Sequence, residues 1–203
     1  MLRLDHIAVS AGRLDEGVAW VEATLGVSLQ GGGQHPLMAT HNRLLGLGDV
    51  YLEVIAPDPT LPRPAQPRWF ALDDFTGPPR LTNWIARCDD LEAALALSPP
   101  GSGRPLVLSR GDLRWRMAVP DDGHLPFDDA FPALIEWQGA AHPTERLASP
   151  VHLLCIEITH PACDRLTAAL SGLLDDPRLR LRTGPAKAMR AVFATPQGER
   201  VLE

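Results

Sequence analysis

The sequence has few of the features that mark nucleic-acid-binding, disulfide-rich or membrane-spanning proteins. Its formal charge is −6, and acidic and basic residues are interspersed without a basic run, which argues against a nucleic-acid partner. The three cysteines (Cys88, Cys155 and Cys163) are odd in number and match no zinc-ribbon spacing. No stretch approaches the ~18 consecutive apolar residues of a membrane span. The N-terminal run MLRLDHIAVS is short and has no small-residue cleavage site, so we expect no signal peptide and a soluble, cytoplasmic protein.

Motifs of several enzyme and regulator classes are also missing. The glycine run at 31–33 lacks the strand-glycine-helix context of a phosphate-binding loop, and no Gly-x-Ser-x-Gly nucleophile elbow occurs. Aromatic residues make up 5% of the chain, and no helix-turn-helix pattern is present. These absences argue against a nucleotide-binding protein, an α/β-hydrolase and a DNA-binding regulator.

What the sequence does contain is a repeated order of predicted elements. At 203 residues the chain is long enough for a substantial core. Strand, helix and three further strands are predicted in each of three units, at residues 1–57, 81–139 and 151–203, with a proline-rich connector at 58–80 that we expect to cross the surface. The predicted fold class is therefore α+β, built from three β-α-β-β-β units.

Two predicted strands of the first unit each carry one polar residue among apolar ones. In residues 50–57 the alternation places Tyr51, Glu53 and Ile55 on one face, and in residues 4–9 it places His6 and Ala8 on one face. A carboxylate is costly to bury in such a strand unless it is paired or binds a metal. The pattern therefore predicts that Glu53 and His6 have partners inside the protein.

These motifs resemble the vicinal oxygen chelate superfamily, which includes glyoxalase I, bleomycin resistance proteins and extradiol dioxygenases. LDHIAV and YLEVIA carry the resemblance most strongly, and THNRLLGLG, NWIAR and PALIEWQG are similar to a branch of glyoxalase-like domains. The resemblance implies that two units pair into a curled mixed sheet around a cup. It also implies a divalent metal in the cup, held by residues from the first and last strands of each unit.

On this resemblance, His6 and Glu53 are the expected metal ligands of the first unit, within about 5 Å of each other. In the second unit Trp84 stands where the first has His6, and Trp cannot bind a metal. Glu136 on its last strand is the expected third ligand, or a general base. Pairing of units one and three, which we consider less favourable, would give a four-ligand set instead: His6, Glu53, Glu157 and Glu203.

Other polar and aromatic residues are candidates for binding a substrate near the mouth of the cup. They are His41, Asn42, Arg43, Trp84 and Trp137. Residues 41–43 alternate, so one face of their strand brings Asn42 inward and the other brings His41 inward. Turn capping or solvation of the hairpin is the alternative for these residues, and we favour it for His35.

Three functions follow from these expectations. The first is a metal-dependent lyase, isomerase or dioxygenase-like enzyme acting on a small oxygenated metabolite, with Zn²⁺, Mn²⁺, Ni²⁺ or Fe²⁺ as the cofactor. The second is a metal-free protein that sequesters a small molecule in the same cup, as a resistance protein does. The third is a structural member whose extra unit serves dimerisation. Because an odd number of units leaves one unpaired, we expect a homodimer.

Overall fold

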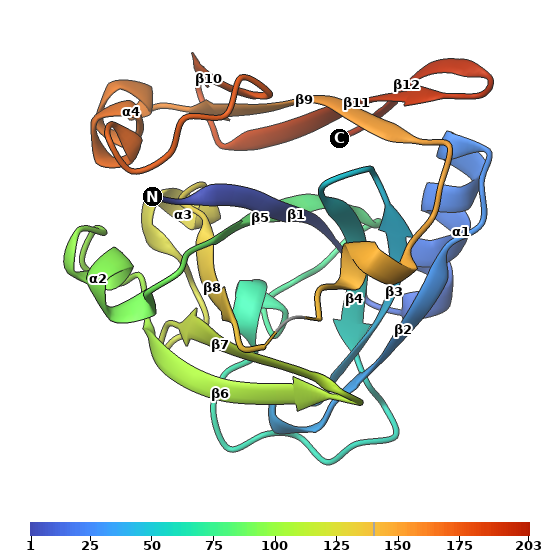
Figure 1. The fold of residues 1–203 in the computed structure, drawn as a ribbon, viewed down its shortest axis with the longest axis horizontal. Coiled ribbons are helices and arrows are strands. Elements are labelled where there is room, and N and C mark those ends of the chain that lie inside the picture. Colours follow the sequence, from blue (N-terminus) through green and yellow to red (C-terminus); the bar gives the residue numbers. More distant parts are fainter. Residues whose placement is uncertain (140) are drawn as a thin grey trace.

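The computed structural model describes residues 1–139 and 141–203, so residue 140, between the second and third predicted units, lies outside the described residues. The described chain folds into an eight-stranded sheet and a four-stranded sheet (Figure 1). The strands of the larger sheet are β1 (Arg3–Ser10), β2 (Gln30–His35), β3 (Thr40–Gly46), β4 (Tyr51–Pro57), β5 (Arg80–Arg87), β6 (Arg104–Arg110), β7 (Leu113–Val119) and β8 (Ala133–Trp137). The strands of the smaller sheet are β9 (His152–His160), β10 (Leu179–Thr183), β11 (Ala188–Thr195) and β12 (Gly198–Leu202).

The large sheet combines the first two units, as the sequence predicted. Its strand order is β2-β3-β4-β1-β5-β8-β7-β6, so β1 and β5 form the seam between the units. In each unit the first and last strands are parallel neighbours, β1 with β4 and β5 with β8. The sheet is mixed, strongly curled and nearly closed, and its concave side forms the predicted cup (Figure 1).

The helix α1 (Leu14–Leu25) covers the convex side of the first unit. Its buried face includes Val21 and Leu25, which follow the apolar spacing of the sequence. Gly26 ends the helix in the left-handed conformation, with φ 70°, and its N–H bonds the carbonyl of Glu22. Gly17 permits close packing against β4, because a Cβ there would lie 2.6 Å from Cγ1 of Val54. The first predicted helix is therefore confirmed.

Shorter helices occupy the corresponding places in the other units. The helix α2 (Leu91–Ala96) begins after Asp90, whose carboxylate caps it by accepting the N–H of Ala93 at 2.9 Å. The helix α4 (Cys163–Leu170) buries Leu166 and Leu170 against the small sheet. A turn of helix, α3 (Pro126–Asp129), lies in the loop between β7 and β8.

The third unit has the predicted order of elements but pairs its strands differently. Its sheet has the order β10-β9-β11-β12, so β9 is a central strand, whereas β1 has only one neighbour, β4, within its own unit. This sheet lies across the convex side of the large sheet, above β1 and β5 in Figure 1. One hydrophobic cluster joins Ile156, Phe193 and Leu202 to Ile7 and Val9. The homodimer prediction assumed that this unit lacks an intramolecular partner, and that assumption is wrong.

The sequence analysis expected the proline-rich connector to cross the surface, but part of the connector is buried. A single 3-10 turn, η2 (Trp69–Ala71), places Trp69 and Phe70 inside the cup, where both side chains are buried. Phe70 and Ala71 have φ values of 58° and 50°, in the left-handed region that L-residues rarely adopt. The connector therefore crosses the open side of the sheet and fills part of the cup.

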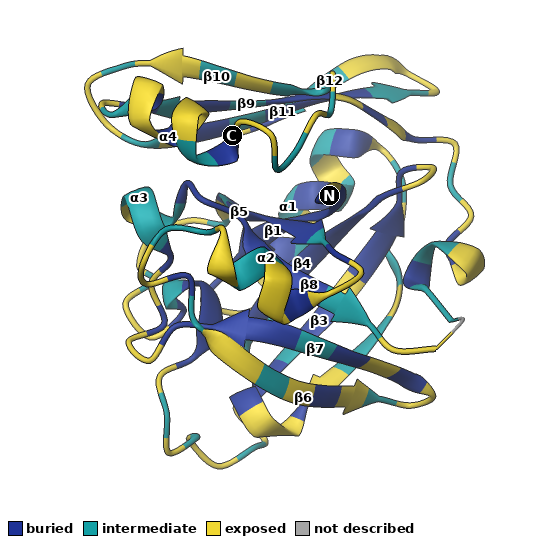
Figure 2. Ribbon diagram, turned by 60° about the vertical axis from the view of Figure 1, so that its left-hand side comes forward, coloured by how far each residue is buried: buried dark blue, intermediate teal, exposed yellow. Residues whose placement is uncertain are grey.

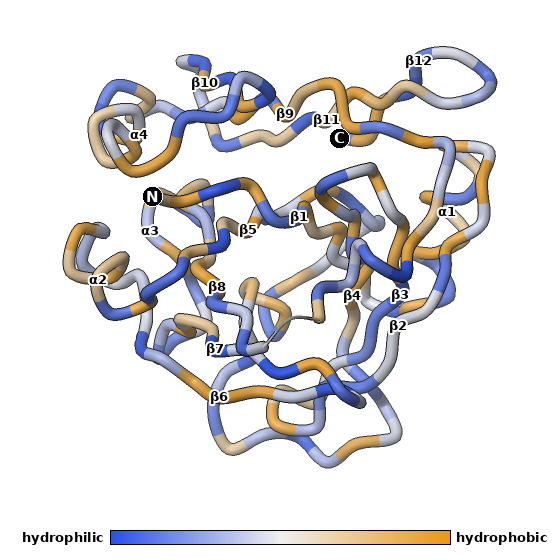
Figure 3. The backbone as a smooth tube through the Cα atoms, in the orientation of Figure 1, coloured by the Kyte–Doolittle hydropathy of each residue, from blue (hydrophilic) through white to orange (hydrophobic). Residues whose placement is uncertain are grey.

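The large sheet is covered on both faces along its central strands, and the burial of its residues reflects this. In Figure 2 the central strands β1, β4 and β8 are mostly buried, whereas β6 is mostly exposed. Figure 3 shows hydrophobic segments in these central strands, as expected for strands that are covered on both faces. No helix in the described part of the chain is long and apolar enough to cross a membrane.

Candidate functional site

The side chains of His6 and Glu53 meet inside the cup. β1 and β4 are parallel neighbours, with Ala8 opposite Glu53, and the alternation along both strands points His6 and Glu53 to the concave side. His6 Nε2 lies 3.5 Å from Glu53 Oε2, and both side chains are almost completely buried. The expected convergence of these two residues is therefore present.

Asp5 completes a chain of three titratable groups. β1 changes register against β5 between Leu4 and His6, and this irregularity lets Asp5 and His6 contact each other. Asp5 Oδ1 lies 2.6 Å from His6 Nδ1, and its other oxygen accepts Trp137 Nε1–H at 3.0 Å. His142 Nε2 also lies 3.0 Å from that oxygen. The imidazole of His6 is thus held between two carboxylates.

A second group of polar side chains binds the other side of Glu53. Asn42 of β3 donates its Nδ2–H to Glu53 Oε1 at 2.5 Å. Arg110, at the end of β6, donates to Asn42 Oδ1 at 2.9 Å and lies 3.4 Å from His35 Nε2. His35 Nδ1 lies 3.1 Å from the hydroxyl of Thr40. Residues from both paired units therefore contribute to one buried polar network.

The charges in this network stabilise each other. Burial raises the pKa of Glu53, but the hydrogen bond and charge of His6, the charge of His35 and the hydrogen bond of Asn42 outweigh burial and hold the pKa at about 2. Burial lowers the pKa of His6, but the hydrogen bonds and charges of Asp5 and Glu53 outweigh it, so the pKa of His6 is raised above its usual value. Glu53 is therefore ionised at neutral pH, and the two carboxylates favour the protonated form of His6.

The surroundings of this ion pair are aromatic. The ring of Tyr51 stacks on His6 with 4.3 Å between centroids and 14° between planes. The ring of Trp115 lies 5.6 Å from that of Trp137, and Trp69 packs edge-on against His35 at 5.2 Å. These rings shield the charged groups from water and give the cup rigid, flat walls.

A small cavity remains at the centre of the cup. Its volume is about 30 Å³, which is room for about two water molecules. His6, Glu53 and Arg110 line it together with Trp69. Nε1–H of Trp69 is buried and, within residues 1–139 and 141–203, has no hydrogen-bond acceptor. The cavity therefore offers several hydrogen-bond donors and one carboxylate to an occupant.

Glu136, the predicted third ligand or general base, does not reach this cavity. Its Oε2 accepts the N–H of Leu91 at 2.8 Å, at the start of α2, and lies 3.3 Å from a guanidinium nitrogen of Arg116. On β8 it is Ile135 and Trp137 that line the cavity, so Glu136 faces the opposite side of the sheet. Glu136 holds the first turn of α2 instead.

The other predicted residues of the second and third units also lie elsewhere. Trp84 is fully buried on the convex side, where its Nε1–H bonds the carbonyl of Ala130 at 2.9 Å. Glu157 pairs with Arg182 at 2.9 Å and Arg190 at 3.1 Å on the small sheet. Glu203 is exposed at the end of the chain. None of these three side chains contacts His6 or Glu53.

Of the substrate-binding candidates, the structure places Asn42 and Trp137 in the cup. His41 and Arg43 point to the other side of β3, toward a groove beside α1. There His41 Nδ1 lies 3.7 Å from Asp58 Oδ2, and Arg43 is exposed. Between the two alternatives for this strand, Asn42 is the residue that faces inward.

The donor set does not fit the metal site that the resemblance implies. Catalytic metal sites in proteins usually have three protein ligands and an open position. Among the described residues, no group of three His, Cys, Asp or Glu side chains is placed to hold a metal ion. The second unit faces the cavity with Ile135 and Trp137, which offer no such ligand. His35 of the first unit also lines the cavity, but it is not grouped with His6 and Glu53 closely enough to complete a metal site.

Several residues of the site were missed in the sequence analysis. Asp5 had a signal, since it precedes His6 in an apolar strand, but only the irregularity in β1 turns both side chains toward the site. His142 lies between the second and third predicted units and was not among the candidates, but it contacts Asp5. Arg110 and Trp69 had no local signal, because non-local packing brings them to the cup.

Comparison with known proteins agrees with this architecture. A sequence model described as "Glyoxalase-like domain" matches residues 4–174. No curated protein matches the sequence. A hypothetical protein from Staphylococcus aureus has a similar structure, with a TM-score of 0.63, 12% identity and coverage of 92% of this chain and 88% of that chain. This likeness shows a shared fold that extends over the small sheet.

Weaker structural matches include methylmalonyl-CoA epimerases. The enzyme from Mycobacterium tuberculosis gives a TM-score of 0.43 and 19% identity, covering 68% of this chain and 88% of that chain. A variant of the Streptomyces coelicolor enzyme, in complex with 2-nitronate-propionyl-CoA, gives a TM-score of 0.44 and 17% identity, covering 68% of this chain and 98% of that chain.

Proposed function

Because the chain belongs to the glyoxalase-like domain family of the vicinal oxygen chelate superfamily, we propose that it binds a small oxygenated metabolite in its cup without a metal ion. The observation that carries the proposal is the buried His6–Glu53 ion pair, which borders a cavity and, among the described residues, belongs to no group of three side chains that could hold a metal ion. The carboxylate of Glu53 accepts hydrogen bonds, whereas His6, Arg110 and Trp69 donate them. A carbonyl or hydroxyl compound matches this set of groups.

The acidity of Glu53 favours binding over catalysis. A general base is most effective when its pKa lies near the working pH. The pKa of Glu53 is about 2, so in the free protein this carboxylate takes up a proton only weakly near neutrality. Glu53 is therefore better suited to accept a hydrogen bond from a polar ligand than to remove a proton from it.

The connector controls the size of the ligand. A molecule larger than about two waters enters only when Trp69 and Phe70 move outward, since their side chains occupy the cup. The left-handed backbone at Phe70 and Ala71 is energetically costly, which lowers the cost of leaving the closed conformation. In this proposal the connector is a lid that closes over the bound metabolite.

The five tryptophans provide a direct test. In protein labelled with 5-fluorotryptophan, Trp69, Trp115 and Trp137 report on the cavity, whereas Trp20 and Trp84 lie outside it and serve as internal controls. We expect pyruvate, lactate or hydroxyacetone to shift the fluorine resonances of the first three only, and Glu53→Gln to abolish the effect. The proposal fails if no probe shifts these resonances, or if all five shift together.

A proton-transfer enzyme is the second candidate, and a specific observation favours it. His6 bridges two carboxylates, Asp5 and Glu53, so a proton given to a ligand could be replaced within the network. Such an enzyme needs the bound ligand to separate Glu53 from His6 and so raise the pKa of Glu53. Exchange of the α-hydrogens of a bound probe with deuterated solvent, lost in Glu53→Gln, would identify this activity.

A further inference from the structure

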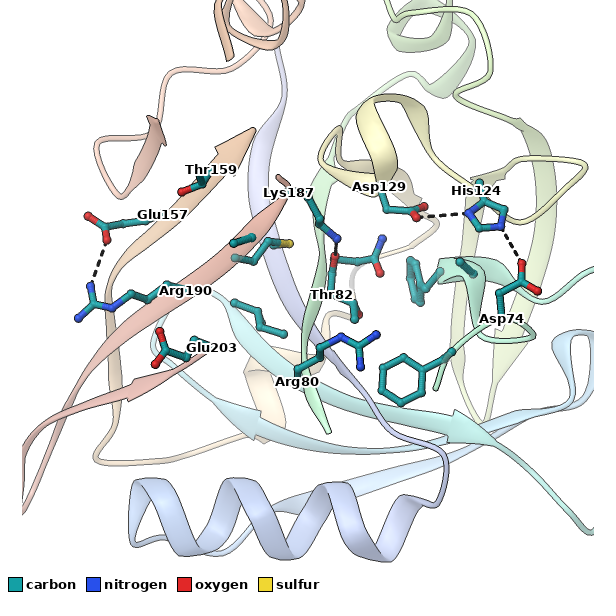
Figure 4. Close-up of a pocket in the computed structure, with 17 residues that line it drawn as sticks. Asp74, Arg80, Thr82, His124, Asp129, Glu157, Thr159, Lys187, Arg190 and Glu203 are labelled. Carbon is teal, nitrogen blue, oxygen red and sulfur yellow. Dashed lines mark hydrogen bonds and ion pairs between the residues drawn. The ribbon is translucent and has the colours of Figure 1, made fainter. Parts of the chain in front are cut away.

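A larger pocket lies outside the cup, between the two sheets (Figure 4). Its volume is about 750 Å³, within the range of pockets that hold small organic ligands. We call it the outer pocket. Its walls come from residues 81–83 of β5, from residues 187–190 at the start of β11 and from the connector. The third unit thus supplies one wall of a site that the first two units could not form alone.

Asn83 is an unsatisfied polar residue in the wall of the outer pocket. Its side chain is fully buried, and within the described chain neither its Nδ2–H groups nor its Oδ1 has a hydrogen-bond partner. Burying an amide without partners is costly, and natural cores avoid it. The neighbouring Thr82 is satisfied, since its hydroxyl lies 2.6 Å from that of Ser10. Asn83 therefore has both a free donor and a free acceptor at the pocket.

Two cations in the same pocket lack anionic partners. Lys187, the only lysine of the chain, donates to the carbonyl of Thr82 at 2.6 Å. Arg80 lies over the ring of Phe75, 4.3 Å from its centroid, and donates only to backbone carbonyls. Across residues 1–139 and 141–203, neither cation has a carboxylate oxygen within 4 Å. Burial lowers the pKa of Lys187, and the nearby Arg80 adds to this effect while Asp129 opposes it.

Three of the acidic residues around the outer pocket are already engaged. Asp129 accepts the N–H of Leu125 at 2.7 Å and faces His124, which also binds Asp74 (Figure 4). Glu157 pairs with Arg190. The groups left free are therefore the two cations, one amide and the exposed carboxylate of Glu203, which lies beside Arg190 in Figure 4. Beside them lie the apolar side chains of Phe70, Leu81 and Met189.

We propose that the outer pocket is a second ligand site, for a small monocarboxylate with an apolar body. The carboxylate pairs with Lys187 and Arg80, a polar atom of the ligand bonds Asn83, and the apolar body packs on Leu81 and Met189. A carboxylate supplies the negative charge that the two cations lack. The site is separate from the cup, although Phe70 lines both spaces.

Methionine methyl signals distinguish the two sites. The chain has four methionines, of which Met189 lines the outer pocket and Met117 lines the cup. In protein labelled at the methionine methyl groups, we expect benzoate to shift the Met189 signal and to leave the Met117 signal unchanged. Benzamide has the same shape without the charge, and we expect it to bind at least about tenfold more weakly.

Matched variants test the proposed contacts. We expect Lys187→Met to weaken benzoate binding by about tenfold or more and Lys187→Arg to restore part of it. Arg200→Met is the control, because Arg200 is a cation of the same sheet that donates only to a carbonyl and does not line the pocket. Asn83→Ala should weaken binding without lowering the melting temperature of the free protein, since it removes an unsatisfied amide.

Four results would overturn the proposal. Three are equal binding of benzoate and benzamide, equal effects of Lys187→Met and Arg200→Met, and a Met189 signal that no concentration of benzoate moves. The fourth is a shift of Met117 in place of Met189. The test does not require a ligand to bind in the cup. Glu53→Gln should therefore leave the benzoate-induced shift of Met189 intact, even if the function proposed for the cup fails.

Discussion

Replacement of Glu53 by glutamine probes the ion pair on which the proposed function depends. The substitution keeps the shape of the side chain and removes one buried charge. The pKa of Glu53 is lowered from 4.5 to about 2, and at about 1.4 kcal/mol for each pKa unit this corresponds to about 3 kcal/mol of stability at neutral pH. Glutamine still accepts the hydrogen bond of Asn42, so we expect Glu53→Gln to lose about 2–3 kcal/mol.

The pH dependence gives the sign of this effect. A carboxyl group with a depressed pKa stabilises the folded state above its usual pKa, and this contribution is lost as the pH falls. For Glu53 the loss runs from about pH 4.5 to about pH 2. Over this range the unfolding free energy of the wild type should fall more steeply than that of Glu53→Gln.

Denaturant unfolding at a series of pH values measures both quantities, and NMR titration of His6 supplies an independent readout. The raised pKa of His6 should fall in Glu53→Gln, because one of its two carboxylate partners is gone. Glu136→Gln is the matched control, since Glu136 binds the start of α2 outside the cup, and it should leave His6 unchanged. The reasoning is refuted if both variants lose the same free energy and neither alters the titration of His6.

Four further predictions follow from the same contacts. Asp5→Asn should lower the pKa of His6 and cost about 3 kcal/mol in denaturant unfolding, and an unchanged His6 titration would contradict the assigned network. Burial lowers the pKa of His35 to about 4, so the wild type should lose about 3 kcal/mol as the pH falls from 6.5 to about 4; His35→Asn should flatten this dependence, and an equal slope in both proteins would argue against it. Trp84→Phe should cost about 1–3 kcal/mol, because it removes the bond to Ala130, and should leave ligand binding in the cup intact; a loss of binding would place Trp84 in the site after all. Because the small sheet packs on the large one, sedimentation at micromolar concentration should give a monomer, whereas a stable dimer would reveal an interface beyond this packing.

The sequence was most informative where local periodicity decides the structure. The spacing of apolar residues located the strands and α1, and the resemblance to a known superfamily implied that two units pair into one sheet. The convergence of His6 and Glu53 was predictable, because both lie on regular strands that are neighbours in this fold. The alternation along each strand then fixed which face their side chains occupy.

The errors in the second unit come from a shift of one residue. WIAR was aligned with HIAV, which put Trp84 at the place of His6, but in the sheet it is Ile85 that lies opposite His6. A shift of one residue moves a side chain to the other face of the sheet. The same consideration applies to Glu136, whose neighbours Ile135 and Trp137 face the cup. The similarity of the motifs therefore identified the strands correctly, but it assigned the wrong residues to the face that lines the cup.

Features that depend on non-local packing could not be predicted from the sequence. The irregularity in β1 that brings Asp5 to His6 has no sequence marker in a single chain. The burial of Trp69 and Phe70 depends on how the connector crosses the sheet. The outer pocket depends on where the third unit packs, and its strand pairing differs from that of the other two units despite the same order of elements.

The central claim is that the cup operates through His6 and Glu53 without a bound metal, and metal content tests it most directly. The wild type, Glu53→Gln and Glu136→Gln are incubated with Zn²⁺, Mn²⁺, Ni²⁺ or Fe²⁺ near neutral pH, freed of unbound metal, and analysed for metal per chain. Because no three donors among the described residues are grouped to hold a metal ion, the account predicts far less than one equivalent in all three proteins. One equivalent in the wild type and in Glu136→Gln, but not in Glu53→Gln, would contradict it.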